Sequence, residues 1–202
     1  MSTTDTLADL DYALDMAKAG RDHPLLGGPI GLMWGVLLFA AFLLQYLILT
    51  QALAWPVGSL GLVWVAFALI GGVGVFILGR RQDARPGART VNNRVETHVW
   101  IMFSAATASL VVGVIANQLF SGGTPQLWDL ILVFGFAGQA LAYGVVARLT
   151  SLGWVAYASL AAALTAIVSM AVYGSPAIYL VGAVGVVLSV VIPSLISIRR
   201  AA

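Results

Sequence analysis

The sequence predicts an all-α integral membrane protein with six transmembrane helices and a short N-terminal amphipathic helix. Hydrophobic residues make up 60% of the chain and charged residues only 9%, whereas soluble domains carry about 25% charged residues. Charge is absent from residues 24–79, from 97–128 with His98 taken as neutral, and from 149–198. A bilayer-spanning helix needs about 20 apolar residues. The runs are continuously apolar rather than alternating, which excludes a membrane-spanning β-barrel.

Residues 1–23 are predicted to form a polar head at the cytoplasmic side. Leu7, Leu10, Leu14 and Ala17 recur at helical spacing and form one apolar stripe. The opposite face of this helix is acidic, so attraction to anionic lipid does not account for it. It either packs on the membrane domain or a second copy, or docks another protein.

Residues 24–202 are predicted to form the membrane domain, with spans near 26–50, 57–79, 96–120, 127–147, 152–172 and 177–198. Pro86 and Gly87 are expected to break any helix in the loop that joins the second and third spans. Asn93 is the expected N-cap of the third span, and Glu96 follows three residues later as in a capping box. Pro193 is expected to bend only the exit of the last span.

The distribution of lysine and arginine predicts the orientation. All ten basic residues fall on one side of the predicted spans, and five of them lie between Arg80 and Arg94. Short loops rich in lysine and arginine stay in the cytoplasm. We therefore expect both termini in the cytoplasm and a place in the inner (plasma) membrane. The composition, rich in alanine, glycine and arginine, is typical of a small bacterial inner-membrane protein.

Recurring landmarks raise the alternative of three helical hairpins. Each odd span carries a tryptophan near its start, and each even span runs from a proline to an arginine. The tryptophans are Trp34, Trp100 and Trp154, and the pairs are Pro56/Arg80, Pro125/Arg148 and Pro176/Arg199. Interfacial tryptophan, N-terminal proline and terminal arginine are favoured in any transmembrane helix. Ordinary span chemistry therefore explains the same landmarks, and both interpretations stay open.

Polar side chains inside the spans are one group of candidate functional residues. Gln139 lies near mid-span, where it either bonds a neighbouring helix or contacts a substrate. Four others lie towards the uncharged outer face: Gln45, Asn117, Gln118 and Asp129. They would line a shallow polar cavity, or simply reach interfacial water.

A second group follows the basic loop and comprises Arg94, Glu96, His98 and Trp100. On a helix, Arg94 and His98 share one face, and Glu96 and Trp100 share another. A histidine at this interface can titrate near neutral pH, so these residues form a candidate binding or sensing site. A capped helix start with solvated charges is the alternative explanation.

No sequence motif indicates an enzyme: there is no phosphate-binding glycine loop, HExxH or GxSxG. Cysteine is absent, so thiolate metal sites are excluded, and we expect no metal, cofactor or nucleic-acid partner. The favoured hypothesis is a non-enzymatic regulatory, sensing or assembly protein that acts through a partner bound at residues 1–23 and 80–100. The alternative is a small oligomeric transporter or channel. Small residues such as Gly138 and Ala142 allow close helix packing, within one chain or between copies.

Overall fold

The computed structural model describes residues 25–85, 87–150 and 152–201. The predicted head at residues 1–23 lies outside this part of the chain. The described residues form helices without any strand, in the order α2 (Gly28–Leu49), α3 (Ser59–Asp83), α4 (Val91–Ser121), α5 (Leu127–Thr150), α6 (Gly153–Ala171), α7 (Ala177–Val186), the π-helical segment η1 (Val187–Val191) and α8 (Ile192–Arg200). With α7, η1 and α8 counted as one span, six helices are long and apolar enough to cross a bilayer. The predicted fold class is confirmed.

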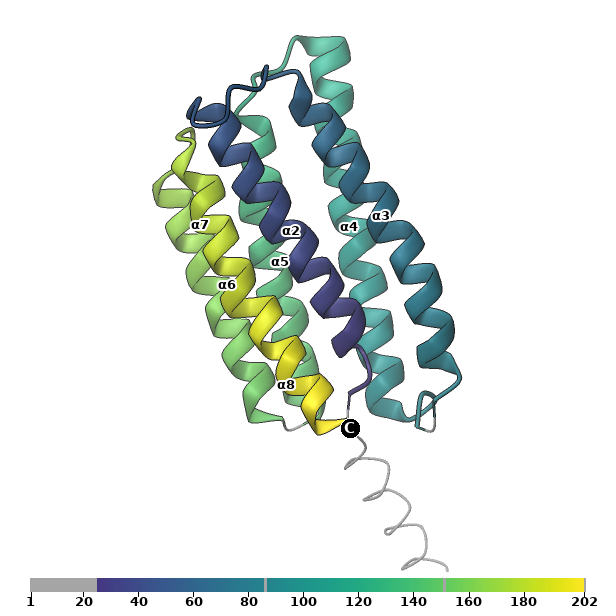
Figure 1. The fold of residues 1–202 in the computed structure, drawn as a ribbon. Coiled ribbons are helices and arrows are strands. Elements are labelled where there is room, and N and C mark those ends of the chain that lie inside the picture. The colour runs from purple at the N-terminus through teal and green to yellow at the C-terminus, as the bar shows by residue number, and fades with distance from the viewer. Residues whose placement is uncertain (1–24, 86, 151, 202) are drawn as a thin grey trace, which may run out of the picture.

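The helices run alternately up and down in two facing rows (Figure 1). In one row α2 packs between α3 and the α7–α8 span, and in the other α5 packs between α4 and α6. The α6 and α7 helices join the rows at one edge, while α3 and α4 stand at the other. All described arginines lie at the end of the bundle where α2 begins and α8 ends, which we call the basic end.

The buried core lies between α2, α5, α6 and α7. Phe42, Phe136 and Tyr179 pack there. The ring centroid of Phe42 lies 6.4 Å from that of Phe136 and 6.3 Å from that of Tyr179. Gly182 sits against this cluster, because a Cβ at this position would lie 2.9 Å from the Leu132 side chain. Tight packing of small residues replaces the hydrophobic driving force that helices lack in lipid. The core therefore belongs to four of the six spans.

Helix α3 packs on α2 through two glycines. The Trp34 ring lies against Gly71 and the Met33 sulfur against Gly74, so that neither position has room for a Cβ. Trp34 also contacts Phe67 on α3 at 5.2 Å between ring centroids. This single seam is the main contact between α3 and the rest of the described bundle.

A π-helical turn interrupts the last span. It covers Val187–Val191 and ends directly before the first turn of α8, which contains Pro193. In a regular α-helix the proline ring would collide with the carbonyl of Ser189, four residues earlier. The π turn widens the helix at that point, and the span continues to Arg200. The distortion thus extends deeper into the span than the bend expected at its exit.

The predicted N-cap of the helix that contains the third span was wrong. Helix α4 begins at Val91, with Thr90 at the N-cap in an extended conformation. Asn93 and Glu96 therefore lie inside the first two turns, where they do not cap their own helix. Gly87, with φ 82°, lies in the middle of the non-helical connection between α3 and α4, where the proline–glycine pair predicts a break.

Candidate functional site

Asn93 binds the chain at the point where it enters α2. Its Oδ1 accepts a hydrogen bond of 2.8 Å from the backbone N–H of Leu26, 67 residues away in the sequence. Its Nδ2 donates to the carbonyl of Gly87 at 3.1 Å and to Thr90 Oγ1 at 3.0 Å. Asn93 is only 1% exposed. It therefore joins the entry to α2, the connection after α3 and the start of α4 at the basic end.

Glu96, one turn further along α4, binds the next residue of the same segment. Its Oε2 accepts a hydrogen bond of 3.3 Å from the N–H of Gly27. Gly27 is the N-cap residue of α2 and has no side chain with which to cap the helix. A carboxylate near a helix N-terminus satisfies a free N–H and favourably opposes the helix dipole. Glu96 therefore caps α2 from a neighbouring helix.

The third contact with this segment comes from α8. Ser197 Oγ donates a hydrogen bond of 3.0 Å to the carbonyl of Leu25, and Ser197 is itself buried. We refer to Asn93, Glu96 and Ser197 as the α2 clamp. The clamp ties the beginnings of α2 and α4 to the end of α8, and it fixes the entry to the membrane domain.

The other predicted residues of this region point elsewhere. His98 Nδ1 lies 2.7 Å from the Arg94 carbonyl, and both residues are exposed. No ion pair joins Glu96 to His98 in the described part of the chain, and Glu96 instead accepts the N–H of Gly27. Trp100 turns inward and packs edge-on against Tyr143 of α5, with ring centroids 4.9 Å apart.

Asp129 organises the opposite end of the bundle. Its Oδ1 accepts a hydrogen bond of 2.6 Å from the Tyr179 hydroxyl, and its Oδ2 accepts one of 3.1 Å from the N–H of Gly174. Only 6% of Asp129 is exposed. Gly174 has φ 78° in the turn between α6 and α7. The carboxylate thus holds α5, the turn and α7 together.

Gln139 lies in the interior of the bundle, close to the π turn, where its partner is Ser189. Its Oε1 lies 3.2 Å from the hydroxyl of Ser189, which also reaches the carbonyl of Gly185 at 2.8 Å. Gln139 and Ser189 are both buried. The structure therefore gives Gln139 the interhelical bond that was one of its two predicted roles.

The remaining polar candidates are distributed over two helices. Gln45 is buried on α2, and its Oε1 accepts a hydrogen bond of 2.8 Å from Trp64 Nε1 of α3. Asn117 is exposed and Gln118 half-buried near the end of α4. Within the described residues, no hydrogen bond joins Gln45, Asn117, Gln118 and Asp129 to one another.

Sequence reasoning missed the interhelical role of Asn93 and did not single out Ser197, Tyr179 or Ser189. A usable signal was the start of α2: a helix that opens with Gly27-Gly28 lacks a capping side chain. Its free N–H groups are therefore open to acceptors from another segment.

The fold defines a polytopic membrane protein, and the carboxyl groups of Glu96 and Asp129 bind backbone N–H groups at opposite ends of the bundle. Among the described residues, no group of three or more histidine, aspartate or glutamate side chains is placed to hold a metal ion. Comparison of the chain with protein-family models, with curated proteins and with solved structures finds no match.

Proposed function

We propose that the protein is a non-enzymatic membrane protein with a regulatory, sensing or assembly role, which acts by binding a partner along α3 and α4. The observation that carries this proposal is the uneven cover of the six spans. In the most apolar 18-residue window of each span, the chain buries no residue of α4 and 6% of those of α3, against 28–50% in the other four.

The uncovered surface is chemically suited to another transmembrane helix. Large apolar side chains such as Leu69 on α3 and Val112 on α4 are each 65% exposed. The same side of α4 exposes Ala105, Ser109 and Gly113, and a Cβ at Gly113 would meet no neighbouring atom. Small residues at four-residue spacing allow a second helix to approach closely in a membrane.

The basic end supplies the second part of the proposed contact surface. Four arginines are exposed here: Arg81 lies in the last turn of α3, Arg85 and Arg89 in the connection that follows, and Arg94 in the first turn of α4. An acidic segment of a partner that reaches past the bilayer surface would meet these guanidinium groups. A partner that used both contacts would lie on one side of the bundle, along α3 and α4 and at their basic end.

Site-specific photo-crosslinking in intact membranes tests the proposal. A photoreactive residue at Val112 of α4 is compared with one at Leu160 of α6, which is 60% exposed and lies on a span that the chain covers well. We expect one discrete adduct from Val112 and none from Leu160. The mass of the adduct tells a second copy from a different protein. Equal, diffuse labelling at both positions would show that lipid alone covers α4.

A second candidate function, transport, has two observations in its favour. The buried Ser169 hydroxyl has no hydrogen-bond partner in the described part of the chain, and a π-helical segment, a frequent feature of functional sites, lies in the neighbouring span. Proteoliposomes carrying a KCl gradient and a potential-sensitive dye test ion movement. A response that depends on Gln139 and Ser189 would support transport; a leak equal to that of protein-free liposomes would count against ion transport.

A further inference from the structure

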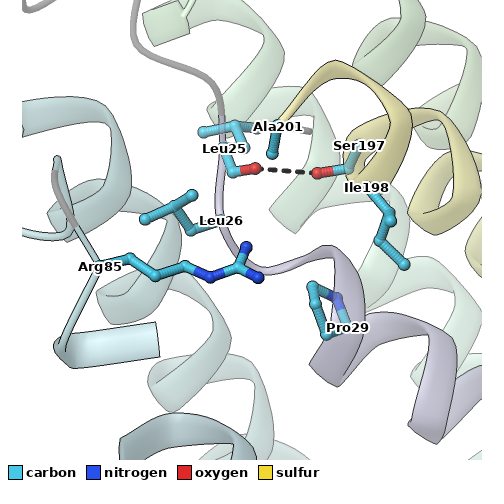
Figure 2. A pocket seen from close by; sticks show the side chains of 7 residues that line it. All are labelled: Leu25, Leu26, Pro29, Arg85, Ser197, Ile198 and Ala201. Carbon is cyan, nitrogen blue, oxygen red and sulfur yellow. Dashed lines mark hydrogen bonds between the residues drawn. The ribbon is translucent and has the colours of Figure 1, made fainter. Parts of the chain in front are cut away.

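We propose that a cavity at the basic end binds the phosphate headgroup of an anionic phospholipid. The cavity has a volume of about 100 Å³ and lies where three segments meet: the entry to α2, the end of α8 and the connection after α3 (Figure 2). Leu25, Leu26, Pro29 and Ile198 form apolar walls, and Arg85 supplies the only charged group of the lining.

The charge of the cavity favours an anion. Figure 2 shows the Arg85 guanidinium extending towards the chain between Leu26 and Pro29. No ion pair joins Arg85 to a carboxylate within the described residues. Glu96 already accepts the N–H of Gly27 at the start of α2, so the positive potential at the cavity comes from Arg85. Guanidinium groups bind phosphate through paired, charge-assisted hydrogen bonds.

The size of the cavity suits one phosphate group rather than a whole ligand. Its volume is on the order of three times the share of one water molecule in the liquid. The Ser197 hydroxyl on the lining already donates to the Leu25 carbonyl, so Arg85 would provide the main polar contact. The rest of the ligand must lie outside, along the apolar walls.

The position of the cavity favours a lipid over a soluble anion. Arg85 follows the last residue of α3 by two positions, Pro29 is in the first turn of α2, and Ile198 is in the last turn of α8. The ends of membrane spans lie at the level of the lipid headgroups. A phospholipid can place its phosphate on Arg85 and its glycerol and upper acyl chains against the leucine and isoleucine side chains.

Native mass spectrometry of the full chain in detergent micelles tests this site. The protein is titrated in separate series with phosphatidylglycerol, phosphatidylcholine and inorganic phosphate. We expect one phosphatidylglycerol to bind at least five times more tightly than phosphatidylcholine, and no retention of inorganic phosphate. Arg85→Gln should weaken phosphatidylglycerol binding about fivefold, the effect of about one basic residue near an anionic lipid surface. The matched control is Arg89→Gln, an exposed arginine of the same connection that does not line the cavity.

A second variant tests the cavity without removing charge. Ala201 lines the cavity near the end of the described chain, and Ala201→Leu should fill it and weaken phosphatidylglycerol binding while Arg85 is intact. Equal losses in Arg85→Gln and Arg89→Gln would overturn the proposal in favour of diffuse attraction. Equal binding of phosphatidylcholine, or competition by inorganic phosphate, would also overturn it. Unchanged binding in Ala201→Leu would place the lipid elsewhere.

Discussion

Replacing Asp129 with alanine should destabilise the membrane domain by about 3 kcal/mol or more, since each hydrogen bond to a charged group contributes about 1.5–3 kcal/mol. The carboxylate accepts two hydrogen bonds, from the Tyr179 hydroxyl and from the N–H of Gly174. Its removal also leaves the Tyr179 hydroxyl, on a side chain that is 5% exposed, without its partner. The predicted loss is a loss of folding stability, and it does not depend on a bound ligand.

A double-mutant cycle isolates the bond between the two side chains. The free energy of unfolding is measured in bicelles by steric trapping for Asp129→Ala, Tyr179→Phe and the combination. We expect a coupling free energy of about 1.5–3 kcal/mol, as for hydrogen bonds to charged groups. Tyr173→Phe is the matched control, because that hydroxyl is exposed and donates only to the Gln126 carbonyl. A coupling near zero, or a loss below 1 kcal/mol in Asp129→Ala, would refute the structural role of Asp129.

Three further predictions concern other contacts. Asn93→Ala should lower the free energy of unfolding by about 2 kcal/mol, because it leaves the buried N–H of Leu26 unpaired. That amide should then exchange its hydrogen faster in a hydrogen-exchange measurement. An unchanged exchange rate would contradict the role given to the α2 clamp. Gly185→Ala should lower the free energy of unfolding by about 2 kcal/mol, because the added Cβ overpacks against the Thr165 side chain. Gly72→Ala is the control, since this position faces open space and the change should not destabilise the fold. Equal free energies of unfolding for the two variants would contradict this prediction. Gln139→Leu should cost about 0.6 kcal/mol, a typical interhelical hydrogen bond in a membrane; a loss above 2 kcal/mol would show that Gln139 has further partners.

The number of spans could be predicted because the bilayer imposes the length and the apolar character of each one. An apolar run of sufficient length has few alternatives to a helix in lipid, and at the basic end charge marks where the run stops, as at Arg80 and Arg199. The six helices confirm this part of the prediction. The described arginines all lie at one end of the bundle, as the counting of loops requires. The side of the membrane to which that end belongs stays a prediction.

The partners of the polar side chains could not be predicted, because they depend on contacts between distant segments. Asn93 and Glu96 have the spacing of a local capping box, yet both bind the start of α2, 67 and 69 residues away. The local sequence cannot show which of two nearby helix N-termini a side chain will bind by hydrogen bonds. Asp129 is a similar case, since its partners lie 45 and 50 residues further along the chain.

The α2 clamp gives α4 a second role besides its exposed apolar surface. Asn93 and Glu96 hold the entry to α2 from the first two turns of α4, while the rest of α4 packs mainly on α5. A partner that bound α4 would therefore contact a helix that is fixed to both rows of the bundle at the basic end. The cavity at Arg85 lies beside the same entry, with Leu25 and Leu26 in its wall. A headgroup bound there would add one more contact to the segment that the α2 clamp holds. The beginning of α2 therefore connects the proposed lipid site with the proposed partner surface on α4.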